Sequence, residues 1–162
     1  MCGGAAGSGK SFIALLYPLK YANDPYFRGI IFRKTTAEIT AQGGLWENAV
    51  ELYRQIFGNR LKVRIKDLKI TFPSGASLKF SHLEQEQDKL RHQGAQYSFI
   101  LFDEGTHFSQ TSVEYLGTRL RSARARHKQQ IVITCNPDPD SFLLEWVKWY
   151  LNEDGTPDLS KD

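Results

Sequence analysis

Two hydrophobic patterns alternate along this 162-residue chain. Short runs of consecutive apolar residues are typical of strands buried on both faces of a parallel sheet. Apolar residues spaced three or four apart are typical of helices with one buried face. The first pattern occurs at residues 29–34, 98–102 and 131–135, and the second at residues 12–19, 36–57, 111–122 and 141–151. This order of elements predicts an α/β domain with a mainly parallel sheet.

Glycine and proline refine this pattern. Pro18 is expected to kink or end the first helix, and Gly43-Gly44 to interrupt the second. Residues 61–67, 68–72 and 76–80 instead alternate apolar and polar positions, with a Pro-Ser-Gly turn at 73–75. A period of two around such a turn indicates an antiparallel hairpin inserted into the parallel sheet.

The segment GAAGSGKS near the start of the chain matches the phosphate-binding pattern G-x-x-x-x-G-K-[ST]. In such a loop the backbone N–H groups surround phosphate, the lysine reaches the β- and γ-phosphates, and the final hydroxyl is a ligand of Mg²⁺. A flexible glycine-rich terminus is the alternative, but the GKS ending and the apolar helix that follows favour a nucleotide site. The predicted nucleotide-binding residues are Gly4, Ala5, Ala6, Gly7, Ser8, Gly9, Lys10 and Ser11, and Ser11 is also a predicted metal ligand.

Two adjacent carboxylates, Asp103 and Glu104, follow the most apolar strand. The carboxyl ends of parallel strands form the ligand-binding edge of an α/β sheet. Asp103 is expected to hold Mg²⁺, and Glu104 to activate the water that attacks the γ-phosphate. An ordinary solvated strand end is an equally good interpretation of this pair alone, and the upstream phosphate loop favours the catalytic interpretation.

Thr134 and Asn136 end the next apolar strand. We expect this strand end to lie beside the strand of Asp103, where Thr134 would contact the nucleotide site and Asn136 would bind the γ-phosphate or the attacking water. The alternative is a cap between strand and turn, since Asn-Pro favours turns by itself.

A basic segment contains Arg119, Arg121, Arg124 and Arg126. It is a solvated helix face, a set of DNA phosphate contacts, or the source of an arginine finger that stabilises transition-state charge. Arg33 and Lys34 form a further cationic pair at the end of a strand near the predicted nucleotide edge.

Composition limits the class of protein. The length suits one domain, and the net charge of +3 permits a nucleic-acid partner without requiring one. The two cysteines and four histidines lack the spacing of a metal site, so we expect a reducing compartment and no zinc. No signal peptide or membrane-length apolar run is apparent, which predicts a soluble intracellular protein without a membrane partner.

Several blocks in order, GGAAGSGKS, IIFRKT, FPSGASLKF, LRHQGAQYSFILFDEGTHF, TRLRS and TCNPDPDSFLLEWVKWYL, resemble the ATPase domain of the large terminase subunit of tailed bacteriophages. The resemblance covers nearly the whole chain. It implies a P-loop NTPase of the additional-catalytic-glutamate type that uses ATP and Mg²⁺ to package double-stranded DNA into a procapsid.

The resemblance also implies roles for individual residues. The phosphate loop would be residues 4–11, Asp103 the magnesium carboxylate, Glu104 the catalytic base, and residues 134–136 the coupling motif. The implied partners are DNA, a small terminase subunit and a portal protein, in a homo-oligomeric motor in the cytoplasm of the bacterial host. A nuclease domain follows the ATPase domain in such proteins.

The chain also departs from this family. Many members carry an arginine inside the phosphate loop, where this chain has Ala5 and Ala6, so Arg119 and Arg121 become the candidate fingers. The expected sheet order is 5-1-4-3-2, yet only Met1-Cys2 remains of strand 1. We therefore predict a truncated ATPase domain at residues 1–151, lacking the strand before the phosphate loop, with a polar tail at 152–162 and an open sheet edge at the strand ending in Cys135.

Other classes of function fit the sequence less well. A nucleotide-binding fragment without useful turnover is the main alternative to an active ATPase. A small-molecule kinase is disfavoured because it does not need Glu104 beside Asp103, and a GTPase because the chain has no N-K-x-D motif. A helicase would need a second motor domain, for which the chain has no room.

Overall fold

The computed structural model describes residues 2–3, 9–136 and 138–161. Its described strands form one seven-stranded sheet in the order β1-β7-β6-β2-β5-β4-β3. The strands are β1 (Cys2–Gly3), β2 (Arg28–Arg33), β3 (Lys62–Arg64), β4 (Lys69–Thr71), β5 (Ser77–His82), β6 (Phe99–Phe102) and β7 (Gln130–Cys135). The α-helices are α1 (Lys10–Leu16), α2 (Thr36–Thr40), α3 (Leu45–Phe57), α4 (Gln110–Gly117) and α5 (Phe142–Val147). Short 3₁₀ helices are η1 (Tyr17–Tyr21), η2 (Gly58–Arg60), η3 (Glu86–His92), η4 (Gly105–His107), η5 (Lys148–Tyr150) and η6 (Leu159–Lys161).

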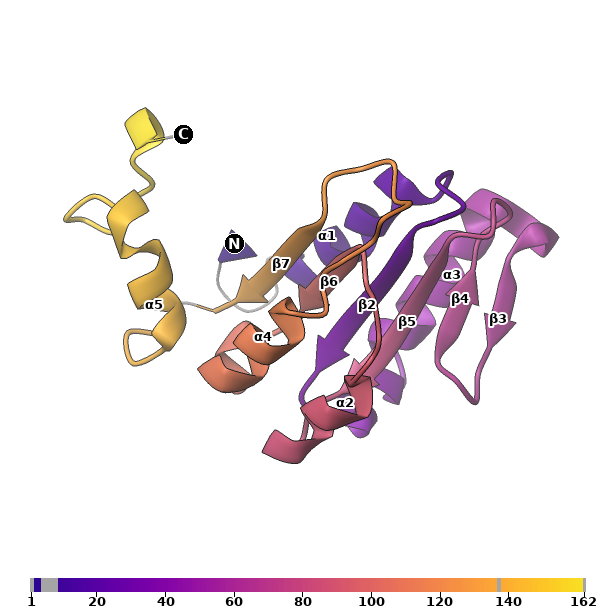
Figure 1. Ribbon diagram of the computed structural model, residues 1–162, viewed down its shortest axis with the longest axis horizontal. Helices are drawn as coiled ribbons and strands as arrows, with labels where there is room; N and C mark the ends of the chain where they lie inside the picture. The colour runs from indigo at the N-terminus through magenta and orange to yellow at the C-terminus, as the bar shows by residue number, and fades with distance from the viewer. Residues whose placement is uncertain (1, 4–8, 137, 162) are drawn as a thin grey trace.

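The sheet is parallel from β1 through β7, β6 and β2 to β5, and antiparallel from β5 through β4 to β3. The inserted hairpin predicted from residues 61–80 is therefore confirmed. Its last strand, β5, also pairs in parallel with β2 and so extends the main sheet. All the parallel strands run in the same direction in Figure 1, which places their carboxyl ends along one edge.

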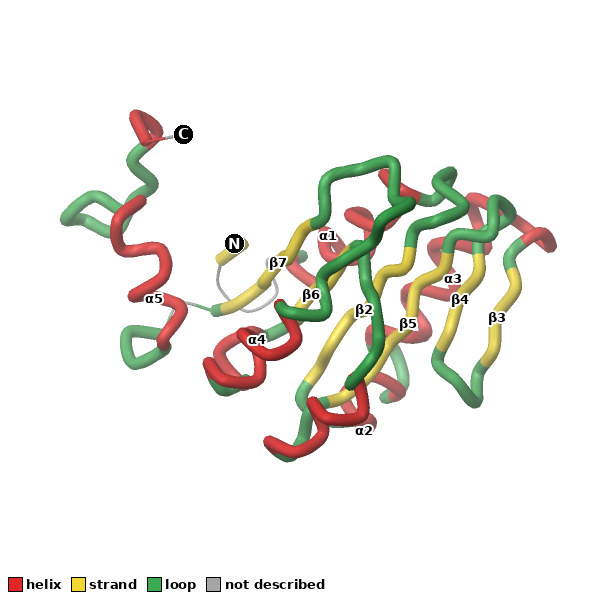
Figure 2. Tube along the Cα trace, viewed as in Figure 1, coloured by secondary structure: helices red, strands yellow, loops and turns green. Residues whose placement is uncertain are grey.

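Two hydrophobic clusters cover the two faces of the sheet. Alternate residues point to opposite faces of a strand, so Ile31 and Leu101 pack into one cluster, and Ile30 and Ile100 into the other. Helices α1 and α3 supply the first cluster and lie behind the sheet in Figure 1, whereas α4 supplies the second and lies in front. Figure 2 shows the same layers by secondary structure.

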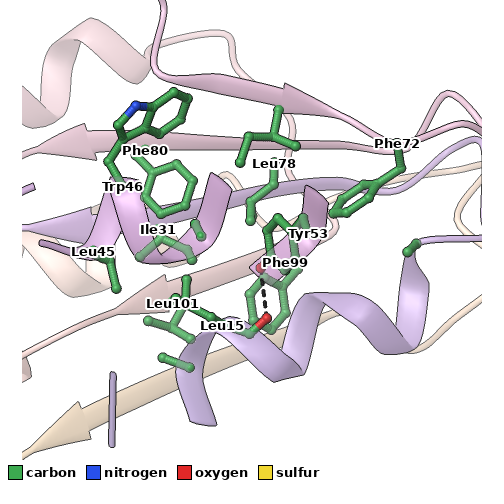
Figure 3. Packing of buried hydrophobic residues seen from close by; sticks show 14 of the residues in the cluster. Leu15, Ile31, Leu45, Trp46, Tyr53, Phe72, Leu78, Phe80, Phe99 and Leu101 are labelled. Carbon is green, nitrogen blue, oxygen red and sulfur yellow. Dashed lines mark hydrogen bonds between the residues drawn. The ribbon is translucent and has the colours of Figure 1, made fainter. Parts of the chain in front are cut away.

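The cluster on the α1 and α3 side is rich in aromatic rings (Figure 3). Tyr53 of α3 is fully buried, and its hydroxyl donates a 2.7 Å hydrogen bond to the carbonyl oxygen of Leu15 in α1. This bond satisfies a polar group in the core. It fixes α1, whose first two residues are the last two of the phosphate-loop motif, against α3.

Local sequence signals account for most element ends. The α-helical part of the first predicted helix stops at Leu16, and Pro18 lies in η1. Gly43-Gly44 separates α2 from α3 as expected. The helix predicted over residues 111–122 is wrong at its end, since α4 stops at Gly117. Beyond it the backbone of Arg119 and Arg121 bonds to Tyr97, so tertiary pairing overrides the helical pattern.

The predictions that the strand before the phosphate loop is lacking and that the strand ending in Cys135 is an open edge require correction. Cys2 and Gly3 form β1 and pair in parallel with Thr134 and Cys135 of β7. The described order β1-β7-β6-β2 matches the expected 1-4-3-2 arrangement. Within the described residues β1 covers only the carboxyl end of β7, and Ile131 near the other end is 39% exposed.

Among the described helices none has the length and apolar character of a membrane span.

Candidate functional site

Strand register brings three polar residues side by side. Phe32 of β2 pairs with Phe102 of β6, and Phe102 pairs with Ile133 of β7. The residues that follow these three are Arg33, Asp103 and Thr134. They therefore meet at the carboxyl edge of the sheet, which is the edge predicted to bind ligand.

Asp103 is the centre of this cluster and is 1% exposed. Its Oδ1 accepts a 2.6 Å hydrogen bond from Thr134 Oγ1. Its Oδ2 accepts hydrogen bonds from Arg33 Nε at 2.9 Å and from Ser11 Oγ at 3.3 Å. Burying a carboxylate is unfavourable unless it is paired and hydrogen-bonded. The three donors, from α1, β2 and β7, meet that requirement.

Glu104 lies beside Asp103 but in a different environment. Its Oε1 is 2.9 Å from Arg33 Nη2, its Oε2 is 3.5 Å from His107 Nδ1, and about a third of its side chain is exposed. Its backbone has φ 60° and ψ 54°, in the left-handed region. A non-glycine residue in this region costs about 1–3 kcal/mol, and such strain is common at functional sites.

Gly105 allows this strained turn to pack against β7. A Cβ atom at this position would lie 2.2 Å from Ile133 Cγ2 and 3.2 Å from Leu143 Cδ1. No side chain fits such a space without displacing the neighbouring strand. Gly105 lies outside the predicted site residues, although a glycine directly after an acidic pair at a strand end is a recognisable signal of close approach.

The first residues of α1 bring part of the phosphate-loop motif to this edge. Lys10 and Ser11 begin the helix after Gly9, whose φ is 77°. The predicted binding residues Gly4, Ala5, Ala6, Gly7 and Ser8 lie outside the described residues. A cavity of about 290 Å³ opens beside Ser11 and Arg33. Its other lining residues are Phe12, Leu15, Gly43, Gly44, Leu45 and Asn48.

The oxygen groups at this edge fit a magnesium ion. Mg²⁺ prefers oxygen ligands and is bound in proteins through one or two carboxylates together with waters and substrate phosphates. The Ser11 hydroxyl and the Asp103 carboxylate are in direct contact and supply such ligands. No cluster of three or more His, Cys, Asp or Glu with metal-site geometry occurs in the described part of the chain. Ser11 and Asp103 could therefore hold a magnesium ion whose remaining ligands are waters or phosphate oxygens.

Arg119 and Arg121 are not brought to this site within one chain. The N–H of Tyr97 donates to the carbonyl of Arg119, and the N–H of Arg121 donates to the carbonyl of Tyr97. Tyr97 precedes the amino end of β6, whereas Asp103 follows its carboxyl end. Six extended residues span roughly 20 Å, so the basic segment lies at the opposite sheet edge. Any finger role for these arginines would have to be directed at another subunit.

Asn136 lies beyond the end of β7 and is exposed. It lines a cavity of about 670 Å³ between this edge and the C-terminal segment. Apolar side chains such as Leu144, Val147 and Tyr150 form much of its wall. The role of Asn136 toward phosphate or water stays a prediction. Thr134, in contrast, bonds directly to both Asp103 and Glu104.

Arg33 is the residue whose importance the sequence pattern understates. The pattern identifies it only as a cation near the nucleotide edge. One guanidinium in fact contacts both Asp103 and Glu104 at 2.9 Å. The signal that could have identified this contact is its position, because Arg33 ends the strand that neighbours β6.

Comparison with known proteins identifies the family of this chain. The model of the family described as "Terminase large subunit, T4likevirus-type, N-terminal" matches residues 1–162. The chain belongs to this family. No curated protein matches this terminase chain.

Solved structures similar to this terminase chain share its fold. The large terminase of a thermophilic bacteriophage, in one of its crystal forms, matches with a TM-score of 0.61 and 21% identity over 84% of this chain and 33% of that one. The ATPase domain of the Thermus phage P74-26 large terminase matches with a TM-score of 0.64 and 18% identity over 97% of this chain and 66% of that one. The HK97 bacteriophage large terminase matches with a TM-score of 0.64 and 12% identity over 90% of this chain and 31% of that one. The chain thus spans about a third of the first and the last of these three proteins.

Proposed function

We propose that this domain binds ATP with Mg²⁺ and hydrolyses it as the motor domain of a large terminase subunit that packages double-stranded DNA. One observation carries the proposal. The buried carboxylate of Asp103 contacts the hydroxyl of the phosphate-loop residue Ser11, and the partly exposed Glu104 follows it directly. This contact supports our assignment of Asp103 as a metal ligand and of Glu104 as the base at the edge that would bind phosphate.

Each residue has a distinct task in this proposal. Residues 4–9 and Lys10 bind the phosphates, and Ser11 and Asp103 hold the ion that neutralises charge on them. Glu104 accepts a proton from the attacking water, for which its carboxylate must be reachable by solvent. Its partial exposure meets that condition.

Thr134 connects this chemistry to β7. Its hydroxyl donates to the Asp103 carboxylate and accepts from the backbone N–H of Glu104, so a shift of that carboxylate or of the Glu104 backbone would reach β7 and Asn136 beyond it. We assign residues 134–136 the coupling role on this basis. The resulting signal would pass to the C-terminal segment, which borders Asn136 across the larger cavity.

The family supports the proposed partners and setting. One similar solved structure is of a DNA packaging motor, and the large terminase of the thermophilic bacteriophage has been crystallised with ADP and with ATP-gamma-S. We propose double-stranded DNA, a small terminase subunit and a portal protein as partners, in a homo-oligomeric motor acting in the bacterial host cytoplasm. The basic segment at residues 119–126 is our candidate for contact with DNA or a neighbouring subunit.

The test uses the purified chain, a fluorescent ATP analogue and an ATP hydrolysis assay with and without DNA. Lys10→Ala should lose most of its affinity for the analogue, because it removes the lysine that pairs with β/γ charge. Glu104→Gln should retain affinity and hydrolyse ATP at least roughly a hundredfold more slowly. The controls are Lys66→Ala, in the turn between β3 and β4, and Glu114→Gln, on α4, both at exposed positions.

Three results would count against the proposal. Undiminished affinity in Lys10→Ala would remove the phosphate-loop assignment. Parental turnover in Glu104→Gln would remove Glu104 from the mechanism. Binding without hydrolysis by the parent chain would favour the nucleotide-binding module over the enzyme.

A further inference from the structure

We infer that Arg33 is a positioning residue that competes with the divalent cation for Asp103 and thereby sets the metal concentration at which the site loads. The inference deepens the proposed function and rests on its assignment of Ser11 and Asp103 as metal ligands. Arg33 belongs to β2, outside both the phosphate loop and the acidic pair, and the inference assigns it a regulating role.

The contacts of Arg33 suit a bridge between the two carboxylates. Nε is 2.9 Å from Asp103 Oδ2, and Nη2 is 2.9 Å from Glu104 Oε1. Nη1 donates to the carbonyl of Glu38 in α2 at 3.4 Å. The guanidinium is a rigid planar fork with five donors in fixed directions, whereas a lysine has three donors on one rotatable ammonium group. The side chain is 16% exposed, so little water screens these contacts.

Arg33 and the cation would compete because both would contact the same oxygen of Asp103. Oδ1 of Asp103 is taken by Thr134, and the oxygen facing Ser11 is Oδ2. Arg33 Nε binds this same Oδ2. A cation held between Ser11 and Oδ2 would lie next to the guanidinium, and like charges in a poorly screened site repel strongly. Metal binding therefore favours release of Arg33 from Asp103.

The cavity beside Ser11 could accommodate the Arg33 side chain after its release from Asp103. Arg33 lines the cavity of about 290 Å³ beside Ser11, together with Gly43, Gly44 and Asn48 from the connection between α2 and α3. Arg33 contacts Glu104 through Nη2 and the Glu38 carbonyl through Nη1. These two contacts can therefore persist when Nε leaves Asp103. Replacement of Arg33 by the cation at Asp103 would thus also affect Glu104 and α2, because Arg33 contacts both.

The experiment measures Mn²⁺ binding by electron paramagnetic resonance, using Mn²⁺ alone and then Mn²⁺ with the fluorescent ATP analogue. The Mn²⁺ midpoint is the Mn²⁺ concentration at which half of the sites are occupied. Arg33→Gln should lower it at least about tenfold, a change of about 1.4 kcal/mol. Arg33→Lys keeps the charge and should stay within about threefold of the parent chain. Lys34→Gln removes a neighbouring positive charge without touching the described carboxylate contacts, and should leave the midpoint nearly unchanged.

A thermal readout separates competition from mere support of the fold. Without metal, Arg33→Gln should melt below the parent chain, because Asp103 loses a buried partner. Added Mn²⁺ should raise its melting temperature by more than it raises that of the parent. A residue with a structural role alone would show the first effect and not the second.

The outcomes are distinguishable. An equal or higher Mn²⁺ midpoint in Arg33→Gln, or no Mn²⁺ binding by either chain, would overturn the competition. If the Mn²⁺ midpoint falls as expected while neither chain binds the ATP analogue, the proposed function fails and the inference about Arg33 stands.

Discussion

Thr134 donates a 2.6 Å hydrogen bond to Oδ1 of Asp103 across two neighbouring parallel strands, and this bond is buried. The same hydroxyl accepts the backbone N–H of Glu104 at 3.3 Å. One small side chain on β7 thus holds both acidic residues, although it lies 31 positions from the first of them. The position of the two carboxylates consequently depends on β7 as well as on their own strand.

Thr134→Val tests this dependence because valine keeps the shape and removes the hydroxyl. We expect a loss of about 1–3 kcal/mol in unfolding free energy, since a buried carboxylate oxygen and an N–H group lose their partner. Urea denaturation measures it. Thr40→Val is the control, because the exposed Thr40 hydroxyl bonds only to a carbonyl of its own helix. Equal stability of parent and Thr134→Val would show that the bond contributes nothing.

Gly105→Ala tests the close approach of the acidic turn to β7. The added methyl would overlap Ile133, so we expect destabilisation of about 1–3 kcal/mol, with weaker nucleotide binding as the turn shifts. Gly117→Ala is a matched control at the end of α4, where the nearest side-chain atom is at an ordinary 3.4 Å. Denaturation curves and analogue titrations for both variants check the prediction, and an unperturbed Gly105→Ala would contradict it.

His92 should make stability depend on pH. Burial, with smaller contributions from the charges of Lys79, Arg91 and His82, lowers the pKa of His92 to about 4. Its ring contacts Tyr97 and Ser81 in the folded chain. Because the folded pKa lies below the unfolded value of about 6.5, the unfolded state binds more protons as pH falls. Stability from this group is present above a pH of about 6.5 and is lost toward a pH of about 4, by up to about 3 kcal/mol.

Denaturation at pH 7.5 and pH 5 measures this effect in the parent chain and in His92→Gln. The stability difference between the two pH values should shrink in His92→Gln. The same difference in both chains would assign the pH dependence to other groups.

Arg119 and Arg121 should act on a partner rather than on the nucleotide of their own chain. We expect Arg119→Ala and Arg121→Ala to leave ATP-analogue affinity unchanged. Each phosphate contact removed should reduce the slope of log K for double-stranded DNA against log salt by about 0.9. Arg60→Ala is the control, since this exposed arginine lies in η2 beside the hairpin strands. Unchanged salt slopes in both variants would make the basic segment a solvated surface.

Much of the architecture was predictable because its signals are local. Short apolar runs such as residues 98–102 favour strands buried on both faces of a sheet, and Pro18 and the Gly43-Gly44 pair act on the backbone at their own positions. The phosphate-loop motif and the Asp103-Glu104 pair are also contiguous. The sequence therefore predicted the parallel order of strands and the edge at which the site lies.

Tertiary structure decided which side chains meet at that edge. Helix propensity extends the pattern of α4 past Gly117, but pairing with Tyr97 fixes Arg119 and Arg121 at the opposite edge. Arg33 carries no local sign of its two ion pairs, which arise because register places it beside Asp103. Hydrophobic periodicity acts over a few residues, whereas register is set by packing between distant strands. The sequence alone thus determined the elements and the chemical groups, and the fold determined which cation holds the carboxylates.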